Sequence, residues 1–179
     1  MRGVLEIIKN IFVRSVCLIV IVLVVMGTAS CSHRHVRCYY ESPFRAEIKW
    51  TVEDTEYLAS VTADSPEGSE RSISLEFHAP ERLNGFVACR SSEGIKLFYD
   101  GFSVDIHNGA ILGAAELVAA VGSFSYVGRA ELDGREVTVA ERTEDSRRTT
   151  LYLDSESGAP LALTADGLDV SVVWFEYLS

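Results

Sequence analysis

Beyond residue 43 the chain alternates between apolar and polar side chains with a period of two. Four stretches show this clearly, and their apolar members are Phe44, Ala46, Ile48, Trp50 and Val52; Ile73, Leu75 and Phe77; Phe102, Val104 and Ile106; and Leu168, Val170, Val172 and Trp174. Successive side chains of a β-strand point to opposite faces, so this period predicts strands with one dry face and one wetter face. Such one-sided strands are typical of antiparallel sheets.

Short turn signals separate the predicted strands. Asp133-Gly134 and Asp166-Gly167 each lie between two apolar-rich stretches, and both predict two-residue hairpin turns because glycine tolerates a positive φ. Residues 65–68 (Ser-Pro-Glu-Gly) and 157–160 (Ser-Gly-Ala-Pro) are further turns. Counting the stretches gives about ten strands, which favours a long antiparallel meander.

One segment departs from the two-residue period. Residues 113–121 are rich in alanine and lie between Gly113 and Gly122, and Ala114, Leu117 and Val121 share one helical face. A helix this short is marginal alone, so we expect it to cover the dry face of the sheet. The predicted fold class is therefore α+β, mostly antiparallel β.

The first thirty residues are a different kind of sequence. They carry Arg2, Lys9 and Arg14 near the start, an unbroken apolar run over residues 16–26, and small residues up to Ser30. This layout is that of a secretory signal, and the run is shorter than the about 20 residues that span a bilayer. An uncleaved anchor helix over residues 7–26 is the alternative, because Arg14 can extend its charge to the interface.

Thr28-Ala29-Ser30-Cys31 resembles a bacterial lipobox, although threonine stands where leucine is usual. The resemblance implies a diacylglyceryl group on the Cys31 sulfur, palmitate-type acylation and cleavage before this cysteine. Two acyl chains anchor a protein stably, whereas one does so only marginally. We therefore expect a lipoprotein on the extracytoplasmic face of the cell membrane. Ser32 is compatible with outer-membrane sorting if the cell has an outer membrane.

Charge is distributed as unevenly as hydrophobicity. The whole chain is 47% hydrophobic and has 16 Lys+Arg against 26 Asp+Glu, a net charge of −10. This composition excludes an intrinsically disordered chain, and the scarcity of basic residues argues against nucleic acid as a partner. Without residues 1–30, which hold three bases and one acid, the remaining 149 residues carry −12. The acidity belongs to the exported part.

Residues 31–42 lack a sustained period and are expected to be a tether between the lipid and a domain over residues 43–179. Arg34 and Arg37 would lie near anionic head groups. Cys31, His33, His35 and Cys38 have the chemistry of metal ligands, but their spacing fits no zinc framework and lipidation would consume Cys31, so no metal site is expected. If Cys31 carries lipid, Cys38 and Cys89 either form a disulfide or remain separate thiols, and the second is favoured.

Several pieces of the domain resemble the LolA/LolB-like lipoprotein-localisation superfamily. They are residues 44–48 (Phe-Arg-Ala-Glu-Ile), residues 77–85 (a strand followed by Pro80), residues 97–104 around Asp100-Gly101, and residues 150–161 with an Asp-x-x-x-Gly-x-Pro turn from Asp154 to Pro160. These motifs are structural, and the match covers roughly residues 44–177. The resemblance implies an incomplete β-barrel with one or two short helices on its concave face and a hydrophobic cavity that can hold acyl chains.

An apolar stripe is the candidate ligand-binding surface. Its members are Ile48, Trp50, Leu75, Phe77, Phe98, Val104 and Leu151. The same residues could instead form an ordinary core, since a domain of this size needs most of its apolar side chains for stability, and this interpretation is slightly favoured.

The sequence contains no motif for a catalytic or cofactor site. The Gly-x-Ser-x-Gly elbow, the P-loop and the His-Glu-x-x-His motif are missing. Glu76 and His78 are best explained as a solvated strand face, and His107 as a turn residue.

Two functions remain, neither of them enzymatic. In the first, the lipoprotein binds a lipid or acylated ligand in its concavity. In the second, it is an interaction module for an envelope protein, such as a cell-wall or spore-germination enzyme, as resemblance to germination-type lipoproteins suggests. The strand predicted over residues 168–177 is a candidate edge for such a partner.

Overall fold

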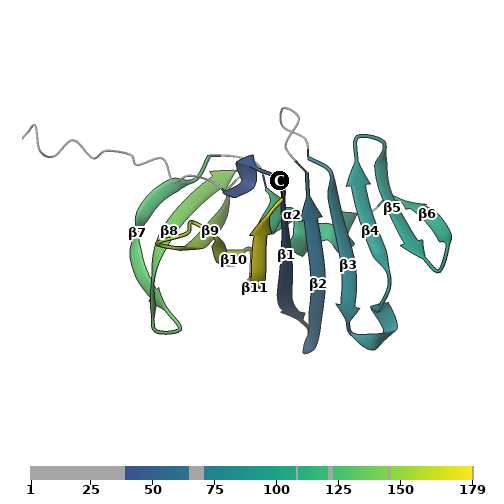
Figure 1. Cartoon of the computed structure of the whole chain (residues 1–179), viewed down its shortest axis with the longest axis horizontal. Coiled ribbons are helices and arrows are strands. Elements are labelled where there is room, and N and C mark those ends of the chain that lie inside the picture. The colour runs from purple at the N-terminus through teal and green to yellow at the C-terminus, as the bar shows by residue number, and fades with distance from the viewer. Residues whose placement is uncertain (1–38, 65–70, 108, 121–122, 145, 179) are drawn as a thin grey trace, which may run out of the picture. The chain divides into compact units, whose positions relative to one another are not determined.

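Eleven strands form a single antiparallel sheet in the computed structural model (Figure 1). The structure describes residues 39–64, 71–107, 109–120, 123–144 and 146–178. The strands are β1 (Phe44–Val52), β2 (Thr55–Ala63), β3 (Ile73–Ala79), β4 (Val87–Ser91), β5 (Gly94–Tyr99), β6 (Phe102–Ile106), β7 (Ser125–Leu132), β8 (Arg135–Glu144), β9 (Arg147–Asp154), β10 (Pro160–Ala165) and β11 (Leu168–Tyr177).

Helices occupy little of the described chain. The α-helix α2 spans Gly113–Ala119, and 3-10 turns lie at η1 (Tyr39–Glu41), η2 (Glu81–Leu83) and η3 (Gly109–Leu112). None of the helices in the described ranges is both long and apolar enough to cross a membrane. The expected export signal over residues 1–30, Cys31, the possible metal ligands and the turn at 65–68 all lie outside the described residues.

The strand order is β6-β5-β4-β3-β2-β1-β11-β10-β9-β8-β7. Two meanders therefore meet where the first strand pairs with the last. The two edges, β6 and β7, follow each other along the chain but are not paired in the described structure, and η3 and α2 lie between them in sequence. This arrangement confirms the predicted incomplete barrel, with eleven strands where about ten were expected.

The place of the last strand corrects one expectation. β11 was a candidate edge for a partner, but it lies between β1 and β10 and pairs with both. A partner can reach the sheet backbone only along β6 or β7, which each pair with one neighbour in the described part of the chain.

Two-residue turns close the predicted hairpins. Asp133 and Gly134 have φ of 50° and 76°, and Asp166 and Gly167 have φ of 49° and 80°. Positive φ at both central positions defines the turn type whose twist matches that of the paired strands. Asp100-Gly101 closes β5 and β6 in the same way.

A bulge in the central pair reverses part of the predicted alternation. The register passes from Glu47↔Trp174 to Ile48↔Val172, so Val173 is an extra residue on β11. One extra residue moves every later side chain to the opposite face. Trp174, expected beside Val170, is consequently exposed, while Phe175 packs against the core.

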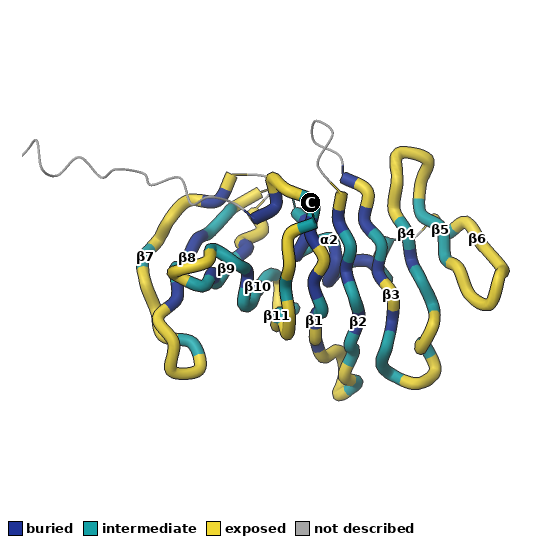
Figure 2. Tube along the Cα trace, in the orientation of Figure 1, coloured by how far each residue is buried: buried dark blue, intermediate teal, exposed yellow. Residues whose placement is uncertain are grey.

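We define the inner face as the side of the sheet that α2 covers, and the other side as the outer face. The buried side chains of the inner face come from both meanders and include Ile48, Leu75, Phe77, Leu151 and Leu163. Figure 2 shows this burial in dark blue on α2 and the central strands. The helix contributes Ala115 and Val118, which are fully buried, whereas the predicted contact residue Leu117 is only half-buried. Of the predicted face, Ala114 is buried and Val121 lies outside the described residues, so the buried side of the helix is wider than predicted.

Residues expected in the tether pack into the domain. Tyr39 and Tyr40 in η1 are buried, and the Tyr39 hydroxyl donates to the Val118 carbonyl at 2.6 Å. The last carbonyls of a helix have no intrahelical partner, so this bond satisfies one of them. Residues 39–42 are therefore part of the packed structure.

The Arg71 side chain also holds the η1 turn in place. Its Nη2 donates to the carbonyls of Tyr40 and Ser42, and its guanidinium lies 5.4 Å from the centre of the Phe44 ring. Burial lowers the pKa of Arg71, although arginine stays protonated in proteins. The contacts compensate in part for burying a charge.

Replacing Tyr39 with phenylalanine tests the link between η1 and α2. We expect a loss of about 1–3 kcal/mol in the free energy of unfolding, because the Val118 carbonyl would be buried without this donor. Chemical denaturation measures the loss. Tyr126→Phe, at an exposed position, is the control and should change stability by less than about 0.5 kcal/mol. Equal losses in the two variants would contradict the assigned bond.

The Asp154 turn provides a pH-dependent prediction. Its Oδ1 accepts from the Ser157 N–H and Oγ, both at 2.7 Å, and from the Glu156 N–H at 3.1 Å. These bonds, led by the Ser157 N–H, lower the pKa of Asp154. The stabilisation is therefore present above the unfolded pKa of about 3.9 and lost as pH falls through the lower folded pKa.

Asp154→Ala should therefore destabilise the protein most at neutral pH, with the difference from wild type shrinking below about pH 4. Denaturation curves across this range measure it. A difference that stays constant with pH would show that the carboxylate charge is not involved.

Candidate functional site

The structure separates the members of the apolar stripe. Ile48, Trp50, Leu75, Phe77 and Leu151 all belong to the buried core. Phe98 and Val104 are 40% and 60% exposed and lie outside that core. The stripe is therefore not one continuous surface.

The strand register of β4, β5 and β6 explains why Phe98 and Val104 are separated from the other stripe residues. Leu97 pairs with Ala88 and Val104, so these three share the inner face, and Phe98 points to the outer face. The Val104 side chain lies on the inner face, as predicted, but its strand β6 is at the edge of the sheet. The five core members have at most 7% of their surface exposed, so a ligand would have to displace packed side chains to reach them.

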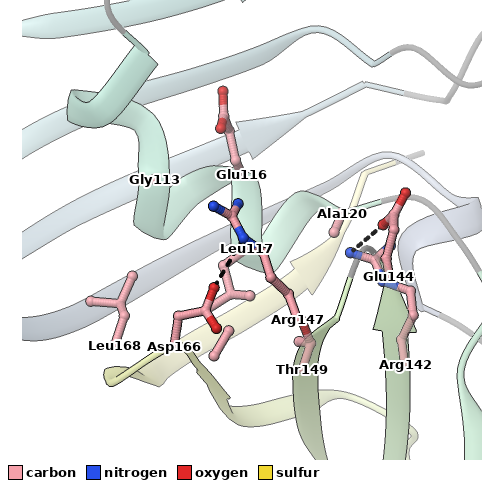
Figure 3. A pocket seen from close by; sticks show the side chains of 11 residues that line it. Gly113, Glu116, Leu117, Ala120, Arg142, Glu144, Arg147, Thr149, Asp166 and Leu168 are labelled. Atoms are coloured by element: carbon pink, nitrogen blue, oxygen red, sulfur yellow. Dashed lines mark ion pairs between the residues drawn. The ribbon is translucent and has the colours of Figure 1, made fainter.

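A pocket of about 760 Å³ lies beside α2, against the ends of two hairpins (Figure 3). The helix side contributes Glu116, Leu117 and Ala120, the β8–β9 hairpin contributes Arg142, Glu144, Arg147 and Thr149, and the β10–β11 hairpin contributes Ala165, Asp166 and Leu168, with Gly113 at the start of the helix. None of the stripe residues lines it. Its volume is within the range of about 300–1,000 Å³ that is usual for small-molecule sites.

Polarity is distributed unequally around the pocket. Leu117, Ala120, Ala165 and Leu168 are apolar and come from the helix and the β10–β11 hairpin, whereas the β8–β9 hairpin supplies the arginines. Thr149 is a buried polar residue of the lining. The helix and the β10–β11 hairpin also contribute Glu116 and Asp166, so the pocket offers apolar surface and charged groups close together.

Ion pairs hold the charged side chains of the lining. Arg147 Nε lies 3.3 Å from Asp166 Oδ2, and Arg142 Nη2 lies 3.6 Å from Glu144 Oε2, as the dashed lines in Figure 3 show. Glu116 pairs with Arg90 of β4 at 2.6 Å. Partly exposed pairs of this kind contribute little to stability and can rearrange at low cost. The Arg142 guanidinium also lies 5.3 Å from the Phe124 ring centre, which orients it.

The other sequence candidates lie elsewhere. His78 Nε2 is 2.8 Å from Ser60 Oγ across β2 and β3, and this pair stands on the outer face, away from the pocket. Cys89 is a free half-buried thiol on β4, while Cys38 lies outside the described residues, so the state of that pair stays a prediction. Within the described ranges there is no group of three or more potential metal-ligating side chains.

The pocket was not predicted, although two of its elements were. The sequence predicts the helical segment and the Asp166-Gly167 hairpin, but it does not single out Thr149, which continues the inward positions of Leu151 and Leu153 on β9. Arg147 and Asp166 belong to different hairpins, and only the sheet topology shows that they meet.

Comparison with known proteins supports the fold. No protein-family model matches the chain, and a search of curated proteins finds no match. Among solved structures, an uncharacterized conserved protein from Thermus thermophilus is 16% identical, with 78% of this chain and 80% of that chain covered and a TM-score of 0.50.

Two further solved structures have lower TM-scores. A LolA superfamily protein from Nitrosomonas europaea is 11% identical, with 82% of this chain and 90% of that chain covered and a TM-score of 0.43. MucB from the Pseudomonas aeruginosa MucA/MucB complex is 13% identical, with 82% and 55% covered and a TM-score of 0.45. The similarity to the Thermus thermophilus protein supports the observed fold. The open sheet with a short helix on its inner face is the architecture that the sequence resemblance implied.

Alanine substitution distinguishes the core members of the stripe from the exposed ones. Phe77→Ala should reduce the free energy of unfolding by about 3–5 kcal/mol because it opens a cavity. Val104→Ala should change it by less than about 0.5 kcal/mol. Urea denaturation measures both. Comparable losses would mean that β6 belongs to the core.

Proposed function

We propose that this protein is a membrane-anchored lipoprotein of the cell envelope that binds a lipid or acylated ligand. The anchor would be the diacylglyceryl group on Cys31, and the ligand would enter the pocket beside α2. The observation that carries the proposal is the mixed lining of that pocket, in which apolar side chains such as Leu117 and Leu168 lie near Arg142 and Arg147.

An amphiphile matches this arrangement. An acyl chain would lie against the apolar side chains of the lining and remove them from water, which stabilises the complex by about 0.8 kcal/mol per buried methylene. The polar end of the ligand would compete with Glu144 and Asp166 for the two arginines. Because those ion pairs are weak, the exchange costs little.

An interaction module for an envelope protein is the second candidate function. It is favoured by the two open edges of the sheet, β6 and β7, along which another strand can pair. Such a protein would need no lipid ligand. Copurification of a stoichiometric protein partner without lipid would support it.

Native mass spectrometry tests the ligand. The full chain, purified from membranes and released from detergent micelles, should carry an additional mass that denaturing conditions remove. The denatured spectrum keeps the covalent acyl groups and therefore reports the anchor separately. Leu117→Glu should abolish the additional mass, because it replaces an apolar side chain of the pocket with a charged one.

Leu132→Glu is the matched control, since Leu132 is also half-buried but lies at the end of β7, outside the lining. It should retain the ligand. A wild-type chain without any removable mass, or a Leu117→Glu variant that keeps it, would overturn the proposal.

A further inference from the structure

The edge strand β6 exposes an apolar surface that the helix does not cover. Phe102 is 76% exposed and Val104 is 60% exposed, and both lie on the inner face with the half-buried Ile106. Figure 2 shows β6 mostly in yellow at the end of the sheet. Tyr99, which pairs with Phe102 and stacks on Phe86 with 4.1 Å between ring centres, extends this surface toward β4.

The backbone of β6 is open on the side away from β5. The two residues that flank a turn of the Asp100-Gly101 type form a hydrogen-bonded pair, so Phe102 and Val104 direct their backbone groups to β5. Ser103 and Asp105 then direct theirs to the free edge. β6 contains no proline, lysine or bulge, which are among the features that protect an edge, although it is short and carries Asp105.

Charge near this edge is acidic. Asp100 and Asp105 are exposed, and neither forms an ion pair with another described residue. Lys96 is opposite Asp105 in the register but pairs with Glu93 at 3.5 Å. A strand added to β6 would therefore place its outer side chains beside Asp105, which forms no ion pair with another described residue, while its inner side chains would contact Phe102 and Val104.

We propose that β6 is a docking edge for an extended segment of a protein partner in which apolar and basic side chains alternate. The apolar side chains would continue the inner face, and the basic ones would pair with Asp105 and Asp100. This surface is separate from the ligand pocket, and the inference rests on the second candidate function, for which it specifies the edge and the chemistry of the partner. A second copy of this chain fits less well, because β6 is acidic and each copy carries a net charge of −10.

Capped, fluorescently labelled peptides long enough to pair along all of β6 are the probes. One alternates valine with lysine, and the other alternates valine with glutamate. Fluorescence anisotropy is measured with the full chain in nanodiscs of zwitterionic lipid and with empty nanodiscs. The lysine peptide should bind saturably, the glutamate peptide about tenfold more weakly, and added salt should reduce the difference.

A charge exchange provides the sharpest variant. Asp105→Lys should weaken binding of the lysine peptide about tenfold and strengthen binding of the glutamate peptide. Ser103→Pro removes an outward N–H without removing a bond to β5, and should weaken both peptides. Val127→Lys is the control, since Val127 is a similarly exposed valine on the opposite edge β7.

Three results would overturn the inference: no saturable binding of the lysine peptide, an Asp105→Lys variant with unchanged preference, or dimerisation of the chain through β6 in sedimentation. Leu117→Glu should bind the peptide like wild type. Loss of the lipid ligand with intact peptide binding therefore separates the two proposals.

Discussion

The pairing of β1 with β11 is the contact on which the rest of the structure depends. It joins two meanders that are otherwise separate along the chain, and it does so between the first and the last strand. Without it, Ile48 and Phe77 on one side and Leu151 and Leu163 on the other could not form one core. A pairing so distant in sequence has a large loop-closure cost, which the shared core under α2 offsets.

The helix α2 covers the core that the pairing of β1 with β11 brings together. α2 packs against strands of both meanders, and its buried side is made of small residues such as Ala115 together with Val118. Small side chains let a short helix approach the sheet closely. The Tyr39 hydroxyl then holds the end of the helix through the Val118 carbonyl, so the start of the domain, the helix and the last strand are tied together at one place.

Much of this fold can be predicted from local patterns, because the two-residue period and the Asp-Gly pairs depend on backbone geometry alone. The period fixes which face a side chain points to, but not what covers that face. Leu75 and Val104 have the same pattern in the sequence, yet one lies under the helix and the other on an open edge. Other features depend on contacts that no short window contains. Val173 becomes a bulge only because β1 sets the register opposite it, Arg71 is buried only because η1 folds over it, and the pocket appears only when two hairpins meet beside α2.

The distribution of charge gives the two proposed surfaces different roles. In the pocket, Arg142 and Arg147 already have acidic partners, so a ligand enters by exchange and gains mainly from burying apolar surface. At β6, Asp105 has no such partner among the described residues, so a basic strand gains a new contact without breaking one. Glu116 lies between these surfaces, because it lines the pocket while its ion pair with Arg90 ties α2 to β4, two strands from the open edge. The helix also packs against β3, so its position, and with it the shape of the pocket, is set partly by the half of the sheet that carries the docking edge.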